Sequence, residues 1–345
     1  MNGILISWLP ALALLLQTSA PIASEPYEQY LEQREFTSPV NGESFVAYVL
    51  DGDLSVIDWD YDRCPHPPLN TLAYALIIDP ATGYVAPPEE FELPTPWEAA
   101  DLASLLGPPR FKRLAPEGLP WAGAYAWEKL ENAALLAQAD DAQAHVIGNW
   151  WLLAGWAVRL DVISGTNEFD TRVRELFDRL PEQGPDPAAL FEPYQLQVAR
   201  TWEEMRNTGQ IPELSDADFA LAMAWLYRSR GELQGAEHWL RMATLGDETL
   251  PDTDLLYQYL YSSISLERHY LGNARRWLVQ AWDNGEFNQM QQAGTAFILA
   301  ELNRRLGDLP AAVFWYNKAE ELNMGLLNQD LISMLREYCS TGVGY

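Results

Sequence analysis

The sequence predicts a mainly α-helical protein with a small β-rich module near its N-terminus. Short runs of β-branched and aromatic residues, separated by Pro and Gly, are confined to the first part of the chain. From Trp121 onward the apolar residues recur with helical periodicity almost to the end. Within that part, two stretches carry small residues and glycines at matching positions. These observations predict a β-rich module followed by an array of helical hairpins.

The chain opens with an apolar segment at residues 4–16 that only Ser7 and Pro10 interrupt. The segment is too short to span a bilayer comfortably, and Ile22-Ala23-Ser24 behind it is a tolerable cleavage site. We therefore expect residues 1–24 to be a secretory signal peptide and the protein to be periplasmic or secreted. Because no Lys or Arg precedes the apolar segment, two alternatives remain: a membrane anchor formed by the uncleaved leader, and a cytosolic protein with an unusual start.

The chain is strongly acidic. It has 345 residues, with 49 Asp and Glu against 22 Lys and Arg, so its formal net charge is −27. Such a surface repels phosphate groups, which argues against nucleic acid as a partner and against membrane contact beyond the leader. Nearly half of the residues are hydrophobic, as in a globular protein. The two cysteines, Cys64 and Cys339, could pair in an exported protein or remain separate buried thiols.

The predicted β-rich module spans residues 25–94. A short helix is expected at residues 27–33, before the first strand. The expected strands are residues 45–50, 54–59 and 72–78. Asp51-Gly52-Asp53 has the composition of a hairpin turn and is expected to join the first two strands.

Two turns of the module share the frame x-Pro-x-x-Gly, in SPVNGE and DPATGY. The same frame binds zinc when it reads Cys-Pro-x-Cys-Gly, because thiolates are the ligands that structural zinc prefers. The four ligand positions are filled here by Ser38, Asn41, Asp79 and Thr82. We therefore expect no metal, and we expect the two turns to face each other through hydrogen bonds.

Three aspartates alternate at the end of the acidic loop 51–62: Asp58, Asp60 and Asp62. Carboxylates this close repel one another unless a cation or an arginine neutralises them. Calcium loops also begin with Asp-x-Asp-x-Asp, but Arg63 and Leu69 stand where those loops need Gly and Glu. The simpler interpretation is a solvated acidic edge with Arg63 as its local partner.

Residues 95–120 are expected to form one helix and a Pro-rich connector. Thr95-Pro96-Trp97-Glu98 combines a capping residue, a first-turn Pro and an acid, and Gly107-Pro108-Pro109 ends the helix. A helical domain then spans residues 121–345. The expected helices are 121–138, 140–163, 167–180, 187–207, 216–230, 232–245, 253–270, 273–284, 288–306, 308–323 and 325–338.

The strongest internal similarity joins ALAMAWLYRSRGELQGAEHWLRMA (220–243) and AFILAELNRRLGDLPAAVFWYNKA (296–319). Four pairs of positions match: Ala224 with Ala300, Gly231 with Gly307, Ala236 with Ala312, and Ala243 with Ala319. This is the tetratricopeptide pattern, in which small residues let two helices cross closely. A weaker middle unit is expected between the two stretches, with its helix break near Gly272. The predicted fold is therefore a ribbon-like β module followed by a tetratricopeptide-like α-helical solenoid.

The order of these parts resembles an uncharacterised bacterial family, a domain of unknown function. Its members carry a zinc-ribbon-like N-terminal part and a tetratricopeptide-like C-terminal half. The family pattern Cys-Pro-x-Cys-Gly-x-x-Phe corresponds to residues 38–45, and Cys-Pro-x-Cys-Gly-Tyr-x-Ala to residues 79–86. The resemblance covers roughly residues 35–325 and implies an architecture but no activity. This chain departs from the family at all four ligand positions and in its leader.

The first helices of tetratricopeptide hairpins line a concave groove. The repeats place these residues there, with Glu301 on the same face: Leu221, Trp225, Arg228, Tyr259, Phe297, Arg304 and Arg305. Aromatic anchors and arginines would suit a peptide with carboxylates or aromatic side chains. Alternatively, they pack against neighbouring helices or against the segment 325–338. We expect an exported, non-enzymatic binding or assembly protein with a protein or peptide partner.

Motifs for catalysis are sparse. The four histidines are scattered, and the sequence has no nucleophile elbow, phosphate-binding glycine loop or paired-histidine metal motif. Cys64 and His66 would give a metal ion only two ligands. We therefore expect no cofactor. The alternative function is a hydrolase-like enzyme that uses the acidic loop 51–62 at the junction of the two domains.

Overall fold

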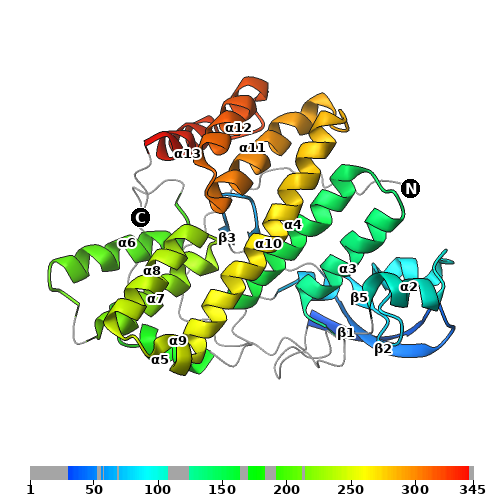
Figure 1. Ribbon diagram of the computed structural model, residues 1–345, viewed down its shortest axis with the longest axis horizontal. Coiled ribbons are helices and arrows are strands. Elements are labelled where there is room, and N and C mark those ends of the chain that lie inside the picture. The colour runs from blue at the N-terminus through cyan, green and yellow to red at the C-terminus, as the bar shows by residue number, and fades with distance from the viewer. Residues whose placement is uncertain are drawn as a thin grey trace.

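The computed structural model describes residues 30–52, 56, 58–67, 70–107, 124–163, 170–182, 192–211 and 214–341. The predicted signal peptide lies outside these residues. The protein is mainly helical, with a small β region near the N-terminus, as the sequence predicts (Figure 1). No helix in the described ranges is both long enough and apolar enough to cross a membrane.

The β region consists, within the described residues, of three two-stranded antiparallel sheets. The pairs are β1 (Leu31–Thr37) with β2 (Ser44–Leu50), β3 (Asp58–Trp59) with β4 (Pro65–His66), and β5 (Ile77–Ile78) with β6 (Val85–Ala86).

Two details of the predicted module are wrong, and a third is not found in the described residues. Residues 31–33 are strand rather than helix, because β1 pairs along its whole length with β2 and brings Phe36 against Phe45. Within the described residues β2 pairs with β1 and β3 with β4, so the predicted pairing of two strands across Gly52 is not found there. Residues 54, 55 and 57 of the second predicted strand lie outside the described residues. Residues 72–78 begin as a short helix, α1 (Leu72–Ala75), before β5, because Lys129 donates to the carbonyls of Ala73 and Leu76 there.

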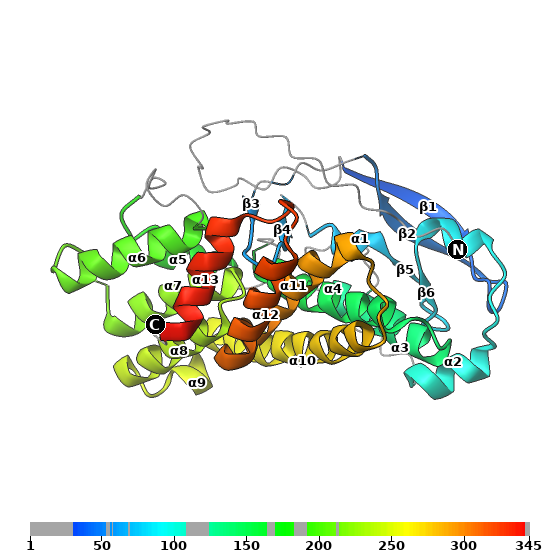
Figure 2. The same cartoon turned by 90° about the horizontal axis from the view of Figure 1, so that it is seen from above.

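The remaining elements are helices. They are the 3₁₀-helix η2 (Pro88–Glu92) and the α-helices α2 (Ala99–Leu106), α3 (Ala126–Ala139), α4 (Ala144–Ile163), α5 (Asp170–Phe177), α6 (Tyr194–Asn207), α7 (Asp216–Ser229), α8 (Leu233–Gly246), α9 (Leu250–Thr253), α10 (Leu255–Asp283), α11 (Gln289–Leu306), α12 (Leu309–Leu322) and α13 (Gln329–Thr341). Figure 2 shows α10, α4 and α3 side by side, with the strands on the other side of α4.

The two predicted outer hairpins form, as α7–α8 and α11–α12, and each turns at a glycine in the left-handed region: Gly231 at φ 64° and Gly307 at φ 88°. The predicted middle hairpin is wrong, because α10 is one continuous helix of 29 residues. Gly272 lies inside it without a positive φ, so nothing ends the helix there.

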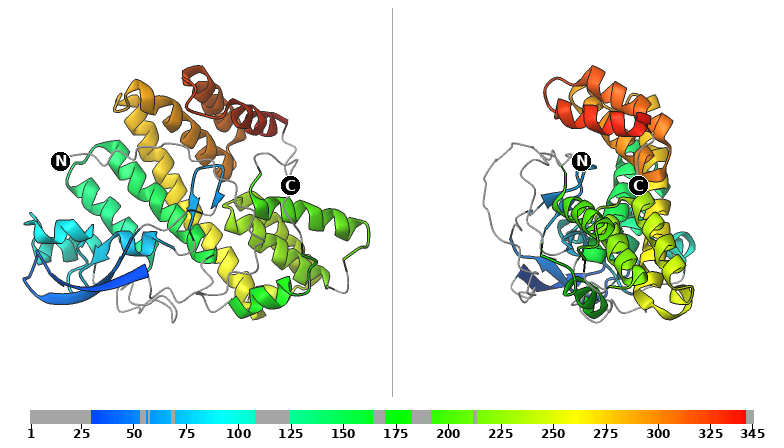
Figure 3. Two further views of the ribbon diagram at one scale, coloured as in Figure 1. Left: turned by 180° about the vertical axis from the view of Figure 1, so that it is seen from behind. Right: turned by 90° about the vertical axis from the view of Figure 1, so that its left-hand side faces the viewer.

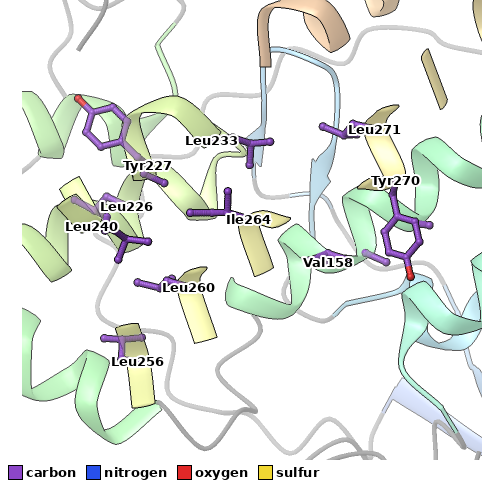
Figure 4. Close-up of a cluster of buried hydrophobic side chains, with 14 of the residues drawn as sticks. Val158, Leu226, Tyr227, Leu233, Leu240, Leu256, Leu260, Ile264, Tyr270 and Leu271 are labelled. Atoms are coloured by element: carbon purple, nitrogen blue, oxygen red, sulfur yellow. The ribbon is translucent and has the colours of Figure 1, made fainter. Parts of the chain in front are cut away.

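The long helix α10 packs along α4, and two glycines of α4 let the helices approach closely. A Cβ atom at Gly148 would lie 2.9 Å from Leu278 Cγ, and one at Gly155 would lie 2.6 Å from Leu271 Cδ2. Leu271 belongs to a buried cluster to which α4, α7, α8 and α10 contribute (Figure 4). This shared core fixes the first hairpin against the central pair of helices.

The β region packs on α3 and α4 (Figure 3). Its own aromatic core is small and surrounds Phe91, against which Phe36, Phe45 and Tyr84 pack edge to face.

Polar side chains of α3 also contact the β region. Beyond the contacts that Lys129 makes with α1, Asn132 of α3 donates to the carbonyl of Gly83 at 3.3 Å. Burial lowers the pKa of Lys129 to about 7. Polar side chains of α3 therefore satisfy buried carbonyls of the β region.

Candidate functional site

A buried group of charged side chains, here called the arginine–carboxylate cluster, lies where the β3–β4 hairpin meets the helical half. Its members are Arg159, Arg228, Arg230, Arg304 and Arg305, with Asp60, Asp62, Glu232, Glu267 and Glu301. None is more than 5% exposed. Figure 1 shows the hairpin over the middle of α10, between α11 on one side and α7 and α8 on the other.

The turn of the hairpin presents Asp60 and Asp62 to the helices. The N–H of Asp60 donates to the carbonyl of Cys64 at 3.0 Å, and the N–H of Arg63 donates to the carbonyl of Asp60 at 2.9 Å. Arg63 adopts φ 66°, as expected for the residue that follows a tight turn and begins a bulge. Its guanidinium group lies over the ring of Phe297, 5.6 Å from the ring centre.

Asp62 is completely buried and has the most contacts. Arg159 binds it with two nitrogens, Nη1 to Oδ1 at 2.8 Å and Nη2 to Oδ2 at 2.9 Å. Trp156 Nε1 donates to Oδ2 at 3.1 Å, and Arg305 Nε lies 3.2 Å from the same oxygen. Burial acts to raise the pKa of Asp62, but Arg159 and Arg305 outweigh it and hold the pKa below its usual range. The carboxyl group is therefore ionised at neutral pH.

Asp60 is held by two arginines and a histidine. Arg159 Nη1 donates to Oδ2 at 2.7 Å, and Arg230 Nη1 donates to Oδ1 at 3.1 Å. His66 Nε2 lies 2.9 Å from Oδ2. Burial acts to raise the pKa of Asp60, but His66, Arg159 and Arg230 together hold it well below its usual range.

The proton of His66 can be placed from these contacts. Arg230 Nη1 lies 3.0 Å from His66 Nδ1, and since arginine has only donors, Nδ1 must accept. The ring proton is then on Nε2, which faces Asp60. Both ring nitrogens thus lie beside charged groups of the cluster.

The remaining carboxylates of the cluster are glutamates and belong to the helical half. Glu267 of α10 accepts from Arg159 Nη2 at 2.6 Å and also from Arg228. Arg304 of α11 donates to Glu232 at 2.6 and 2.7 Å and to Glu301 at 3.0 and 2.8 Å. These pairs hold Arg228 and Arg304 within the helical half.

A metal ion could be held only by one set of the described residues: Asp60, Cys64 and His66, whose ligand atoms lie within 4.8 Å of one another. Two observations weigh against a cation. Arg159 and Arg230 already donate to both oxygens of Asp60, and burial raises the pKa of the Cys64 thiol well above its usual range. Moreover, the five arginines and five carboxylates of the cluster balance, which leaves no excess negative charge for a metal.

The interpretation of the aspartates as a solvated acidic edge is wrong for Asp60 and Asp62. Both are buried, and their partners are Arg159, Arg230 and Arg305 rather than Arg63. The side chain of Asp58 lies outside the described residues. The calcium interpretation has no support here either, because guanidinium groups occupy the oxygens that a calcium ion would need.

The predicted groove residues separate into two groups. Arg228, Arg304 and Arg305 gather in the cluster, and Phe297 lies beside it under Arg63. The other three, Leu221, Trp225 and Tyr259, are placed elsewhere. Leu221 is completely buried in the main core, Trp225 packs on Phe177 at 5.1 Å between ring centres, and Tyr259 donates to Asp161 at 2.8 Å. Three of the seven predicted groove residues, Phe297, Arg304 and Arg305, contact the protein's own β3–β4 hairpin.

The two x-Pro-x-x-Gly turns are the loops of the β1–β2 and β5–β6 hairpins, and their backbones match. The N–H of Ser38 donates to the carbonyl of Glu43 at 2.8 Å, and that of Asp79 to the carbonyl of Tyr84 at 2.9 Å. Gly42 and Gly83 have φ 77° and 78°. At each of the four ligand positions, the side-chain oxygen accepts from the N–H two residues later.

Three of the four ligand positions come together. Ser38 Oγ and Thr82 Oγ1 each donate to Asp79 Oδ2 at 2.5 Å. Asn41 stays exposed and donates to Glu43 of its own turn at 3.2 Å. A buried carboxylate therefore joins the two turns, with hydroxyl donors on both sides of it.

Four cluster residues escaped the sequence reasoning: Arg159, Arg230, Glu232 and Glu267. Arg159 had a visible signal, since it stands in the apolar helix WWLLAGWAVRLDVI, where a charged residue needs a buried partner. Arg230 and Glu232 flank Gly231, which the repeat had marked only as a helix end. The sequence left open whether Cys64 and Cys339 form a disulfide. They are separate buried thiols.

Comparison with known proteins gives a partial match for the helical half. No curated protein and no solved structure was found to match the chain. Residues 192–341, from just before α6 to the end of α13, match the model of a family described as uncharacterized protein conserved in bacteria (DUF2225). The matched range covers less than half of the chain and does not include the two x-Pro-x-x-Gly turns. The C-terminal part of this protein, including Arg228, Arg230, Arg304 and Arg305, is therefore similar to that bacterial family.

Proposed function

We propose that the protein is an exported, non-enzymatic binding or assembly protein whose helical half recognises a protein or peptide segment. One observation supports this proposal above the others. The inner face of the helical half binds the short segment Asp60-Tyr61-Asp62 through Arg159 of α4, Arg230 just after α7, and Arg304 of α11. A separate peptide with the same side chains would find the same contacts.

Because the hairpin is part of the same chain, a partner must compete with it. A tethered segment competes at an effective concentration on the order of millimolar. A partner that binds this face therefore needs further contacts, or it binds only the fraction of molecules in which the hairpin is displaced. This mechanism would keep the face closed until the right partner is present.

The test compares the wild type with the Asp60→Asn/Asp62→Asn variant. Both proteins are immobilised and exposed to the periplasmic or secreted fraction. We expect at least one protein to be enriched on the variant, because Arg159, Arg230 and Arg305 lose the carboxylates that the hairpin supplies. The control is Asp51→Asn/Asp101→Asn, which removes two exposed carboxylates. Identical partners on both variants would contradict the proposal.

The second candidate is a hydrolase-like enzyme that uses the acidic loop. It is favoured by the closeness of Asp60, Cys64 and His66. We place it second because all three side chains are buried and the raised pKa of Cys64 keeps its thiol protonated. Alkylation with iodoacetamide of the native protein at pH 7 tests this candidate. An enzyme of this kind requires rapid labelling at Cys64, whereas a structural thiol reacts only after unfolding.

We further propose that the two matching turns are a metal-free version of a zinc-ribbon knuckle pair. Their equal backbone geometry and the hydrogen bonds that join Ser38, Asp79 and Thr82 support this proposal. Restoring the thiolates tests it. The variant Ser38→Cys/Asn41→Cys/Asp79→Cys/Thr82→Cys should bind one zinc ion per chain and gain thermal stability with zinc. Failure of the folded variant to bind zinc would refute the relation.

A further inference from the structure

We infer that the ligand class of the face that contacts residues 60–62 is an Asp-aromatic-Asp segment, for which residues 60–62 are the competitor within the same chain. This inference rests on the proposed function and names the ligand of that face. It follows from three features of the cluster: an excess of positive charge on the helical half, two separate carboxylate positions, and a cationic contact for the aromatic ring between them.

Among the members of the cluster, the helical half carries two more arginines than carboxylates. It supplies all five arginines of the cluster but only three of the carboxylates: Glu232, Glu267 and Glu301. Five minus three leaves two positive charges, and Asp60 and Asp62 neutralise them. In a chain with a net charge of −27, such a local excess is a selective feature, because it favours a segment with two negative charges.

The two carboxylate positions differ in geometry. Arg159 binds Asp62 through two parallel hydrogen bonds, the usual bidentate geometry of a guanidinium–carboxylate pair. Asp60 instead lies between Arg159 and Arg230, which donate to different oxygens. Because the positions are set for residues i and i+2 of one segment, a single carboxylate or an inorganic anion can satisfy only one of them.

The residue between the aspartates is aromatic for a physical reason. The guanidinium carbon of Arg304 lies 5.6 Å from the centre of the Tyr61 ring. Glu232 and Glu301 hold that arginine in place, so the aromatic contact is formed by a preorganised cation. A small residue at this position would lose the contact, whereas Phe or Trp would keep it.

The experiment measures binding of a synthetic peptide to the full-length chain. The peptide covers residues 58–66 with Cys64→Ser, and the host is the Asp60→Asn/Asp62→Asn variant. We expect the peptide to bind the variant at least tenfold more tightly than the wild type, by fluorescence anisotropy. A peptide with Asp60→Asn/Asp62→Asn should not bind, and one with Tyr61→Ala should bind several-fold more weakly.

Two results would overturn the inference. One is a folded variant, shown by circular dichroism, that does not bind the peptide at millimolar concentration. The other is equal binding of the Asn-substituted peptide or of inorganic phosphate, which would reduce the face to an unspecific anion site. If the double variant does not fold, Asp60→Asn alone serves as host, because Asp62 then still neutralises Arg159. A preference of at least threefold over the wild type is expected, and its absence counts against the inference.

The same reagents separate this inference from the proposed function. If the peptide binds but no exported protein is enriched on the variant, the ligand class stands and the proposed function fails. If an exported protein is enriched but the peptide does not displace it, the proposed function stands and the ligand class is wrong.

Discussion

Asp62 illustrates, at the scale of a single residue, how a charge is kept in a protein core. A carboxylate without partners would be very unfavourable there, but its oxygens face Arg159, Arg305 and Trp156. Buried ion pairs of this kind often add little net stability compared with apolar side chains, whereas removal of one partner costs about 3–5 kcal/mol. The contacts of Asp62 therefore determine where the hairpin binds more than how stable the protein is.

Gly231 offers a sharp test of the packing in the cluster. A Cβ atom at this position would overlap the guanidinium groups of Arg159 and Arg305. We expect Gly231→Ala to lower the free energy of unfolding by at least about 3 kcal/mol, measured by urea unfolding. Gly285→Ala is the matched control, because Gly285 has a similar φ of 67° with open space around it. Its cost should be only about 1–2 kcal/mol, and equal costs would contradict the packing.

Glu286 gives a prediction about pH. Its carboxylate accepts from the N–H groups of Ala144 and His145 at the start of α4, at 3.2 and 2.9 Å. Burial acts to raise its pKa, but hydrogen bonds from Asn284, His145 and Ala144 lower it to about 2. Because the folded-state pKa is depressed, the stabilisation exists above the unfolded pKa of about 4.3 and is lost as the pH falls toward 2.

The measurement compares the wild type with Glu286→Gln. At pH 7 the variant should be less stable by about 1 kcal/mol, since an anionic cap at a helix N-terminus is lost. The difference should shrink between about pH 4.3 and pH 2, when the wild-type carboxylate becomes protonated. A difference that does not depend on pH over this range would show that the charge of Glu286 is unimportant.

At the scale of the element, α10 is the feature that departs most from a repeat array. The sequence predicts a helix end at Gly272, but the helix continues through it. A Cβ atom there would meet nothing within 4 Å. The continuous helix is favoured because Leu271 and Leu278, on either side of the predicted break, pack along the glycines of α4.

Gly272→Ala is therefore expected to stabilise the protein by about 0.5–1 kcal/mol, the usual gain from Ala over Gly inside a helix. Gly155→Ala, a substitution of the same kind, should destabilise it by about 1–3 kcal/mol, because its Cβ would lie 2.6 Å from Leu271. Both values can be measured by thermal unfolding. Destabilisation by Gly272→Ala would instead indicate a helix break at that position.

The sequence predicts the elements that short-range rules control. The hairpins α7–α8 and α11–α12 follow from glycines at their turns and alanines at their crossings, both of which are local signals. Prediction from the sequence fails where contacts with residues far along the chain determine the secondary structure. Residues 31–33 are strand because β2 lies beside them, and Gly272 is helical because α4 covers its neighbours.

The candidate site was predictable in part for the same reason. The repeat placed Arg228, Arg304 and Arg305 on one face, because their spacing within the helices fixes the direction of their side chains. What fills that face could not be read from the sequence, since Asp60 and Arg230 are 170 positions apart. Only the fold shows that Asp60 and Asp62 of the acidic loop are the partners of the cluster arginines.

At the scale of the whole molecule, the charge is divided unevenly between the arginine–carboxylate cluster and the rest of the chain. The cluster contains 5 of the 22 basic and 5 of the 49 acidic residues. The rest of the chain therefore has 22 − 5 = 17 basic and 49 − 5 = 44 acidic residues and carries the entire net charge of −27. Repulsion among the exposed acids of this remainder opposes folding, while the neutral cluster is shielded from the solvent.

Salt should therefore raise the stability of this protein, although arginine–carboxylate pairs are prominent in it. We expect the Tm to rise by several degrees between about 0.01 and 0.1 M NaCl, where the Debye length falls from about 30 to about 10 Å. Calcium chloride at equal ionic strength should give the same Tm, because Asp60 and Asp62 are already paired with arginines. A Tm that falls with NaCl would mean that exposed ion pairs dominate the stability.

The length of α10 has a mechanical consequence. An array of separate helical hairpins can bend and stretch at each joint, so its groove adapts to ligands of different width. Here one rod of 29 residues, about 43 Å long, contacts the helices of both outer hairpins. The distance between those hairpins is thereby fixed, and a protein with the function proposed above should discriminate among segments by shape as strictly as by charge.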